Sequence, residues 1–320
     1  MSLSYEYSVG SIKAKENSLL SKQDLEMLVV AESLDAFMNI LRDKGYDGDT
    51  VESMLENKTA ELWQYIKSIA PEADSVNVFL YRNDLHNIKA TIKGVLSGRA
   101  YEQLLLSNAT IDVNVLRQAV EKRKFSLLPE WLAEAADSAY EVIAHNSDSR
   151  LGDAILDKAA MSLMLKATEK LNENIKSYFK MLVFYNDVKV ALRAVRTSTT
   201  ADYIRAAVCE VEGVDLEKWV KSAVSGSDEM LDLLSKISLY GCETAIKAFK
   251  KSPSEFEKCV DNMLIAQMRK CRYSVDGIET IFGYIIASEA EIKLLHIIAS
   301  GIRTGAGEQF IRERLRDING

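Results

Sequence analysis

Proline is scarce in this sequence: only 3 of its 320 residues are prolines. A proline inside a helix removes a backbone hydrogen bond and clashes with the preceding turn, so this scarcity favours long, uninterrupted helices. Signals for strands are missing as well. No segment sustains a period-two alternation of apolar and polar residues, and no Asn-Gly or Asp-Gly turn joins two β-rich runs. The sequence therefore predicts an all-α fold.

Cysteine pairs and long apolar runs are also absent. The 4 cysteines, Cys209, Cys242, Cys259 and Cys271, form no CxxC pair and no His/Cys cluster with zinc-ligand spacing. This pattern indicates a reducing cytosol and no disulfide framework. Residues 1–10 lack the apolar stretch of a signal peptide, and no run of about 18 apolar residues occurs, so we expect neither export nor a membrane span.

An excess of positive charge is missing too. Lys and Arg number 40 against 47 Asp and Glu, which gives a net charge of −7 and a pI near 5.3. This balance excludes the basic footprint of a nucleic-acid binder and the polybasic run that holds anionic lipid. The remaining composition, 48% hydrophobic and 27% charged, is ordinary for a soluble chain of two or three domains.

An internal repeat stands out against this ordinary background. Residues 87–93 (NIKATIK) align with residues 187–193 (DVKVALR), 100 positions later, and residues 291–295 (EIKLL) follow after another 104 positions. A second pair of stretches, 153–157 and 257–261, is also 104 positions apart. A repeat of this length is long enough for each copy to be a small domain.

The spacing of the copies predicts three similar helical domains. They cover residues 1–108, 109–210 and 211–320. The polar stretches 107–114 and 211–215 are the expected joints, and because neither is long or rich in Gly and Ser, we expect closely coupled domains. The alternative is that amphipathic helices resemble one another by chance, since helical periodicity places apolar residues in register.

Capping signals mark several of the expected helices. Ser21 opens a capping-box-like start, and Ser33 precedes a second helical apolar face. Residues 252–255 (SPSE) combine an N-cap, a proline at the first helical position and an acidic residue near the helix start. Two long helices are expected, one from Pro71 to about Gly98 and one over residues 153–185.

The three histidines do not form a catalytic or metal-binding pattern. His86, His145 and His296 belong to no HExxH motif and to no triad signature. His86 follows Asp84 by two residues on an expected helix, so the two side chains do not share a face. His296 is flanked by apolar residues, and we expect it to be partly buried and hydrogen-bonded.

The glycines near the C-terminus do not form a phosphate-binding loop. Gly301, Gly305 and Gly307 come shortly before an expected helix, but they fit neither GxGxxG nor GxxxxGK[ST], and no strand precedes them. The sequence therefore predicts a turn that joins two helices.

Acidic residues near this end of the chain could suggest a pair of catalytic carboxylates. Glu279, Glu289 and Glu291 are close in sequence. However, carboxylates two residues apart on a helix point in different directions. We expect these three glutamates to lie on an exposed acidic face.

Each repeat copy has a lysine at the same position. These residues are Lys89, Lys189 and Lys293. Asp157 precedes Lys189 by 32 positions, and Asp261 precedes Lys293 by the same distance. We expect these two aspartates to pair with the lysines of the second and third copies, in an architectural role.

No convergent set of catalytic, cofactor-binding or metal-binding residues emerges from the sequence, and the residues that bind a partner stay unassigned. Catalysis requires such convergence. A helical repeat chain without it is typical of a scaffold or coupling part. Two other hypotheses are a helical scaffold or regulatory protein that binds peptide or protein partners in a central cavity, and a hydrolase whose site lies between the repeats.

A family resemblance emerges from the succession of several segments, no one of which is decisive alone. Together they resemble the C subunit of the V/A-type rotary ATPases (ATP synthases), whose eukaryotic counterpart is the d subunit, and the resemblance spans the whole chain. In chain order, the segments are Tyr7–Leu20, Leu128–Asp157, Phe256–Asn262, Phe282–Lys293 and Ile311–Leu315.

The resemblance has one local departure. The family usually has Asn-Leu-Arg after its Glu-x-Glu segment, whereas this chain has Leu294, Leu295 and His296. The resemblance implies an all-helical protein of three similar domains around a pseudo-threefold axis, which together form a funnel. We expect the helix at this departure to persist, since leucine and histidine are compatible with it.

The resemblance also implies a function. Its members seat on the cytoplasmic face of the membrane proteolipid ring, as peripheral subunits, and receive the central shaft of the ATP-hydrolysing head. They turn with the rotor, pass torque for ion transport, and bind no nucleotide, cofactor or metal. The chain is thus expected to be a non-catalytic central-stalk subunit, with the choice of Na⁺ or H⁺ and the direction of ATP turnover left open.

Overall fold

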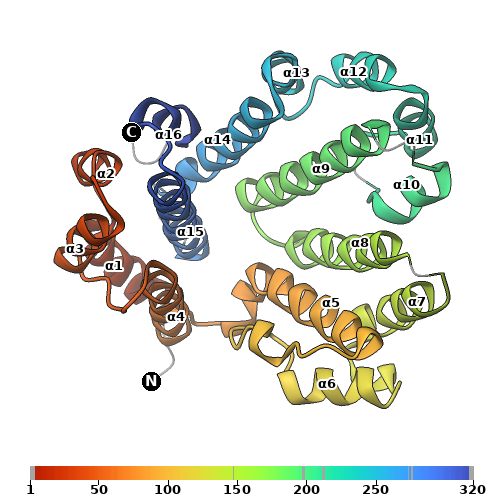
Figure 1. The fold of residues 1–320 in the computed structure, drawn as a ribbon, viewed down its shortest axis with the longest axis horizontal. Coiled ribbons are helices and arrows are strands. Elements are labelled where there is room, and N and C mark those ends of the chain that lie inside the picture. The colour runs from red at the N-terminus through yellow and green to blue at the C-terminus, as the bar shows by residue number, and fades with distance from the viewer. Residues whose placement is uncertain are drawn as a thin grey trace. The chain divides into compact units, whose positions relative to one another are not determined.

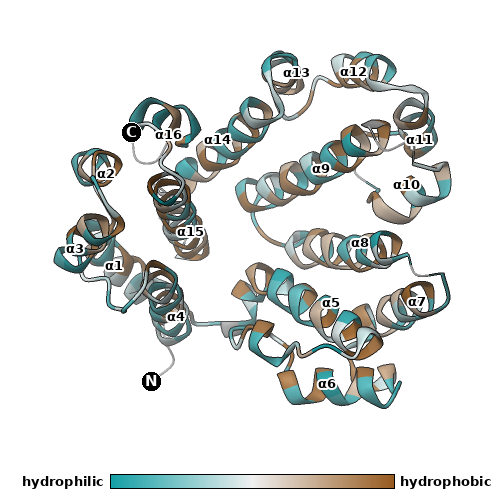
Figure 2. Ribbon diagram, viewed as in Figure 1, coloured by the Kyte–Doolittle hydropathy of each residue, from teal (hydrophilic) through white to brown (hydrophobic). Residues whose placement is uncertain are grey.

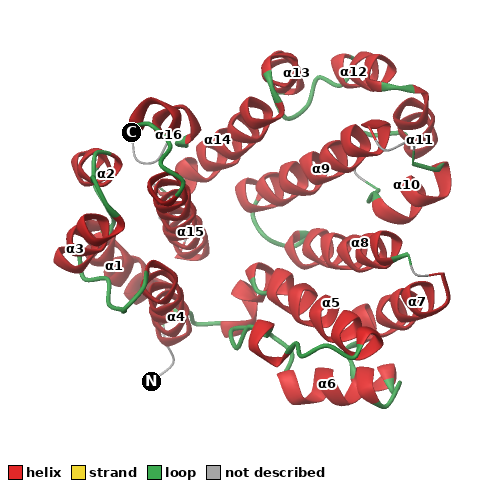
Figure 3. Cartoon of the chain, in the orientation of Figure 1, coloured by secondary structure: helices red, strands yellow, loops and turns green. Residues whose placement is uncertain are grey.

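The structure is a computed structural model with side chains. It describes residues 4–146, 148–196, 199–210, 213–272, 274 and 277–316. Within this part of the chain the regular elements are helices, and no described residue lies in a strand (Figure 3). The predicted all-α class is confirmed. The helices form two compact units, which are residues 1–73 with 244–320 (unit 1) and residues 74–243 (unit 2).

Unit 1 is built from both ends of the chain, coloured red-brown and blue in Figure 1. The N-terminal helices are α1 (Tyr5–Lys15), the 3-10 helix η1 (Glu16–Ser18), α2 (Lys22–Val29), α3 (Leu34–Asp43) and α4 (Val51–Ile69). The C-terminal helices are α13 (Cys242–Lys251), which crosses the unit boundary, α14 (Pro253–Arg272), α15 (Gly277–Arg303) and α16 (Glu308–Arg314). The long helix α15 packs against α1, α3, α4, α14 and α16.

Unit 2 is a continuous stretch of the chain. Its first half contains η2 (Ala73–Phe79), α5 (Tyr81–Ser97), η3 (Glu102–Leu104), α6 (Val113–Glu121), η4 (Phe125–Leu127) and α7 (Glu130–Asn146). Its second half contains α8 (Ser149–Thr168), α9 (Glu173–Arg196), α10 (Ala201–Ala207), α11 (Leu216–Ser225) and α12 (Ser227–Ser235). Helix α8 packs against α5, α7, α9 and α10.

The hydrophobic core of unit 1 joins residues from the two ends of the chain. Phe37 and Met54 are fully buried, in the same cluster as Leu295 and Ile298 of α15. Hydrophobic residues recur along α15 in Figure 2. Because each large apolar side chain contributes about 1.5–3 kcal/mol on full burial, this shared core stabilises the association of the N-terminal and C-terminal segments.

The core of unit 2 has two parts. Ile92 of α5 packs in one cluster with Leu116 of α6 and Leu156 of α8. Farther along the chain, Phe184 of α9 lies edge-on against Trp219 of α11, with 5.8 Å between ring centroids. Helix α9 therefore packs its aromatic face against the segment that follows α10.

The predicted helix starts at three serines are confirmed. Ser21 Oγ accepts a hydrogen bond from the Asp24 N–H (3.2 Å), and the Asp24 carboxylate accepts one from the Ser21 N–H (2.9 Å), which completes a capping box. Ser33 caps α3 and Ser252 caps α14, each through a hydrogen bond from the N–H three residues later, at 3.1 and 3.0 Å.

Two helices predicted as continuous are interrupted. The helix expected from Pro71 to Gly98 divides into η2 and α5, and Phe79 at the end of η2 packs against Phe179 of α9. The helical region expected over residues 153–185 divides after α8. Asn172 Oδ1 accepts the Ile175 N–H at 3.2 Å and caps the start of α9.

The division into three similar domains, with breaks after residues 108 and 210, stays a prediction, as does the pseudo-threefold funnel. Residues 211 and 212 of the second expected joint lie outside the described residues. The first expected joint, residues 107–114, contains Asp112, which caps α6.

Candidate functional site

The three histidines are exposed and lie apart in the sequence. His86 Nε2 lies 2.8 Å from a backbone carbonyl oxygen, and His145 Nε2 lies 2.9 Å from the Glu141 carboxylate on the same helix. The expectation that His296 is partly buried is wrong: it is exposed, because Leu295 takes the buried face of α15. Among the described residues, no three or more His, Cys, Asp or Glu are grouped to hold a metal ion.

Two of the three C-terminal glycines, Gly305 and Gly307, lie in the predicted turn between two helices. Gly301 lies inside α15, where an added Cβ would come 2.5 Å from Ile311 Cγ1. Gly305 has a φ of +65°, a left-handed conformation that favours glycine. Gly307 then directly precedes α16. These glycines therefore allow a close helix–helix approach and a sharp reversal of the chain.

The expected exposed acidic face of α15 is wrong for two of its three glutamates. Glu279 and Glu291 are buried, with exposed fractions of 5% and 3%, whereas Glu289 is partly exposed. The physical reason is that α15 packs against five other helices, which leave little of its surface to solvent. A buried acid needs hydrogen-bond partners, so the contacts of Glu291 identify the segments that it holds against α15.

Glu291 receives two hydrogen bonds from the N-terminal part of the chain. Its Oε2 accepts the Leu20 backbone N–H at 2.5 Å, and its Oε1 accepts the Tyr46 hydroxyl at 2.6 Å. Burial raises the pKa of the Glu291 carboxyl above its usual value, and the two hydrogen bonds oppose that shift. The two oxygens thus fasten the start of α2 and the end of α3 to α15.

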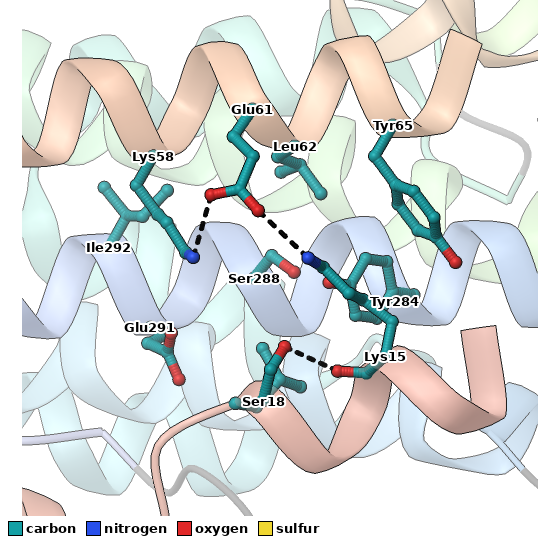
Figure 4. Close-up of a pocket in the computed structure, with 11 residues that line it drawn as sticks. Lys15, Ser18, Lys58, Glu61, Leu62, Tyr65, Tyr284, Ser288, Glu291 and Ile292 are labelled. Carbon is teal, nitrogen blue, oxygen red and sulfur yellow. Dashed lines mark hydrogen bonds and ion pairs between the residues drawn. The ribbon is translucent and has the colours of Figure 1, made fainter. Parts of the chain in front are cut away.

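A small cavity lies beside this contact in unit 1. Figure 4 shows Glu61 between two lysines, with Lys58 Nζ at 3.0 Å and Lys15 Nζ at 2.9 Å from its carboxylate oxygens. Ser288 Oγ lines the cavity and has no hydrogen-bond partner among the described residues. The volume of about 20 Å³ is room for about one water molecule. This cavity is therefore too small for a metabolite or nucleotide.

Asn87 makes a similar contact in unit 2. Its Oδ1 accepts the Leu106 backbone N–H at 2.8 Å, and its Nδ2 donates to the Leu106 carbonyl at 2.9 Å. One turn earlier on α5, the buried Asp84 carboxylate accepts the Thr110 N–H at 2.9 Å and the Thr110 hydroxyl at 2.6 Å. Asp84 is thus buried while His86 is exposed, which confirms that the two side chains point apart.

Asp187 repeats the contact on α9. Its Oδ2 accepts the Cys209 backbone N–H at 3.0 Å, and its side chain is 3% exposed. Burial raises the pKa of Asp187 to about 8, which the Cys209 N–H and the charge of Lys158 only partly oppose. Trp219, Asp187 and Cys209 line a second cavity, of about 10 Å³.

Asn87, Asp187 and Glu291 are equivalent positions of the repeat, each two residues before the repeat lysine. All three are buried, and each accepts a backbone N–H from a segment that leads into another helix: α6, α11 and α2 respectively. We call these three pairs the anchors. The sequence analysis did not predict these buried hydrogen bonds. The sequence did contain a signal for them, because every repeat copy has a polar residue at this position next to apolar residues.

The lysine–aspartate pairs follow the repeat only in part. Lys293 Nζ lies 2.6 Å from Asp261, as predicted, and Arg316 Nε joins it at 2.8 Å. Asp157, however, pairs with Lys89 of the first copy at 2.5 Å, not with Lys189, because α5 packs directly against α8. Burial raises the pKa of Asp261, but the hydrogen bonds from Lys293 and Arg316 outweigh it and hold the pKa below its ordinary value.

These contacts are suited to holding segments of the chain in place. The buried carboxylates of Asp84, Asp187 and Glu291 accept backbone N–H groups or hydroxyls, and the exposed or partly exposed Asp157 and Asp261 pair with lysine or arginine. No helix in the described ranges is both long and apolar enough to cross a membrane. The three anchors hold the backbone of Leu20, Leu106 and Cys209 on the longer helices α15, α5 and α9.

Comparison with known proteins gives one consistent family. Residues 8–314 match the family described as ATP synthase (C/AC39) subunit. The chain is 20% identical to the C subunit of the V-type sodium ATPase of Enterococcus hirae, over 96% of each chain. It is 26% identical to the C subunit of the A-type ATP synthase of Methanosphaera stadtmanae, over 93% of this chain and 84% of the relative. It is 22% identical to the C subunit of the V-type ATP synthase of Thermus thermophilus, over 92% and 93%.

Proposed function

The chain belongs to the ATP synthase (C/AC39) subunit family, and from this we propose that it is the central-stalk rotor subunit of a V/A-type ATPase. In this role it is a non-catalytic socket that couples the central shaft of the ATP-hydrolysing head to the membrane proteolipid ring. The observation that carries the proposal is the family match over residues 8–314. Catalysis then belongs to other subunits.

The relatives bear names that differ in ion and direction. One belongs to a sodium ATPase and others belong to ATP synthases. The proposal therefore covers rotary coupling and ion transport and leaves the ion unassigned. We place the chain at the cytoplasmic face of the membrane, held there by the proteolipid ring and the shaft.

Stiffness is the physical property that supports this role. A part that transmits torque must not deform under load, and close-packed interiors have low compressibility. In unit 1 the two ends of the chain share one core and are fastened by the Glu291 hydrogen bonds to Leu20 and Tyr46. A load applied to either end of the chain is therefore carried by the same packed body.

The anchors also support a threefold plan for the socket. One buried polar residue in each repeat copy holds the segment before another helix, at Asn87, Asp187 and Glu291. Three similar domains, proposed as residues 1–108, 109–210 and 211–320, would present similar helices to a round ring. Ring and socket need not share symmetry if their contact depends on broad complementarity of shape and charge.

The proposal is tested by rebuilding the rotary complex with and without this chain. ATP hydrolysis and ion transport are measured side by side on the same vesicles. We expect the complex without the chain to keep hydrolysing ATP while ion transport stops, because no part joins shaft to ring. The complex rebuilt with the wild-type chain is the matched control and regains transport.

Salt adds a second arm to this test. Exposed charge pairs are screened over about 8 Å at physiological ionic strength, so attachment of a chain with a net charge of −7 is expected to weaken as salt rises. Ion transport that continues unchanged without the chain would contradict the coupling role. The helical-scaffold hypothesis would then be pursued by identifying the peptides that the chain retains.

A further inference from the structure

The Asn87 anchor shows which hydrogen-bonding groups a side chain at this repeat position uses. Asn87 both accepts the Leu106 N–H and donates to the Leu106 carbonyl, at 2.8 and 2.9 Å. Its amide therefore presents one acceptor and one donor to a single backbone residue. A carboxylate in the same place has two acceptors and no donor.

Asp187 is the equivalent residue of the second copy, and only one of its two carboxyl oxygens has a hydrogen-bond partner among the described residues. Oδ2 accepts the Cys209 N–H at 3.0 Å, whereas Oδ1 is buried without a hydrogen-bond partner among the described residues. No described lysine or arginine forms an ion pair with it. Lys158, the nearby cation on α8, donates instead to the Arg205 carbonyl at 2.8 Å.

The space beside Asp187 is small. The adjoining cavity of about 10 Å³ is at the lower limit for a single water molecule. The indole N–H of Trp219, which lines the same cavity, is also buried without a hydrogen-bond partner among the described residues. An ionised carboxylate in this place would have the Cys209 N–H as its hydrogen-bond donor and no ion pair among the described residues, which is costly in a protein interior.

We propose that Asp187 is a neutral carboxylic acid in the folded protein, with its proton on Oδ1. The equivalent Asn87 amide donates to a backbone carbonyl, so a protonated Oδ1 gives this position the donor that it has in the first copy. Ionisation of Asp187 removes the donor and places a charge in the core, so the hold of Asp187 on Cys209 weakens as the pH rises. The effect is independent of the rotor role.

The groups around Asp187 fit this assignment. Burial raises the pKa of Asp187 to about 8. Burial also raises the pKa of the Cys209 thiol to about 12, so that thiol stays neutral between pH 6 and 9. Helix α8 contributes Lys158 and Asp157, and Asp157 is already paired with Lys89. Helix α11 contributes Trp219, which does not titrate.

The sign of the pH effect follows from proton linkage. The folded state keeps the Asp187 proton up to about pH 8, whereas the unfolded chain releases it near pH 4. The stability from this proton is full below pH 4 and is lost as the pH rises through 8. Between pH 6 and 9 the folding constant is expected to fall by about 100-fold on this account.

The test uses the full-length chain and two reciprocal variants. Asp187→Asn supplies a permanent donor, and the ratio of its folding constant to that of the wild type should grow by about 100-fold from pH 6 to 9. Asn87→Asp places a second carboxyl in the equivalent anchor and should make the alkaline loss steeper. Urea unfolding at each pH measures both changes.

Two further measurements guard against a variant that does not fold. In the wild type, the fluorescence of Trp219, identified by its loss in Trp219→Phe, should change with a midpoint near pH 8. Hydrogen exchange of the Cys209 amide, corrected for intrinsic rates, should accelerate over the same range. Parallel pH profiles for the wild type and Asp187→Asn, or Trp219 fluorescence that is constant from pH 6 to 9, would overturn the proposal.

Discussion

The Glu291 carboxylate accepts the backbone N–H of Leu20 at 2.5 Å, across 271 residues of sequence. This hydrogen bond fixes the residue before the N-cap of α2 to the middle of α15. The equivalent bonds at Asn87 and Asp187 span only 19 and 22 residues. The first two anchors are thus local, whereas the third closes the chain by joining its ends.

Removing the Glu291 anchor should destabilise the protein strongly. Glu291→Leu leaves the Leu20 N–H and the Tyr46 hydroxyl buried without an acceptor, at a cost of about 1–3 kcal/mol for each. Tyr46→Phe is the matched control, because it removes a single hydrogen bond and keeps the Leu20 anchor. Urea unfolding of both variants measures the difference. Equal losses for Glu291→Leu and Tyr46→Phe would show that the Leu20 bond contributes little.

Two aspartates at the same place in the repeat should differ in importance. Asp261 is 14% exposed and lies between Lys293 and Arg316, so Asp261→Ala should cost on the order of 3 kcal/mol. Asp157 is 41% exposed and pairs with Lys89 alone, so Asp157→Ala should cost at most about 1 kcal/mol. Chemical denaturation at neutral pH makes the comparison.

The Asp261 pair also predicts an acid effect. Because the folded protein holds the pKa of Asp261 below its ordinary value of 3.8, its stabilisation is complete above that value. It is lost as the pH falls through the lower, folded-state pKa. The unfolding free energy of the wild type should therefore approach that of Asp261→Ala as the pH falls from 5 to 2. A constant gap between the two would argue against this pair as the cause.

Two helical glycines should respond to alanine in opposite directions. An added Cβ at Gly94 would come 2.2 Å from the Tyr101 ring, and such overpacking typically costs about 1–3 kcal/mol. Gly10 lies on the exposed side of α1 with nothing within 4 Å of the added atom. Gly10→Ala should stabilise the chain by about 0.5–1 kcal/mol through helix propensity. Thermal unfolding of the two variants is the measurement.

Replacing all three histidines should leave coupling intact. His86, His145 and His296 are exposed and lie in no shared cluster, so the variant His86→Gln/His145→Gln/His296→Gln should assemble, hydrolyse ATP and transport ions at wild-type ratios. Reconstituted vesicles give both rates. A loss of transport in an assembled complex would assign a histidine to the transport step.

Much of the local structure was readable from the sequence. Ser21, Ser33 and Ser252 marked helix starts correctly, because a cap depends on residues only three positions apart. The break within residues 71–98 was not readable in advance. Phe79 at this break packs against Phe179, 100 residues later in the chain, and local sequence does not reveal such a contact.

At the candidate site, too, the sequence predicted the register of the residues but not their burial or their partners. The repeat placed Asn87, Asp187 and Glu291 in register, but the exposed acidic face expected at Glu291 was wrong. Likewise Asp157 paired with Lys89, because the packing of α5 against α8 decided its partner.

The sequence by itself determined the helical class, the caps and the repeat, since these follow from spacing and composition along the chain. The tertiary structure alone decided which acids are buried and which backbone groups they hold. Burial depends on neighbours brought from far along the chain, and Leu20 reaches Glu291 only when the two ends of the chain pack into one core.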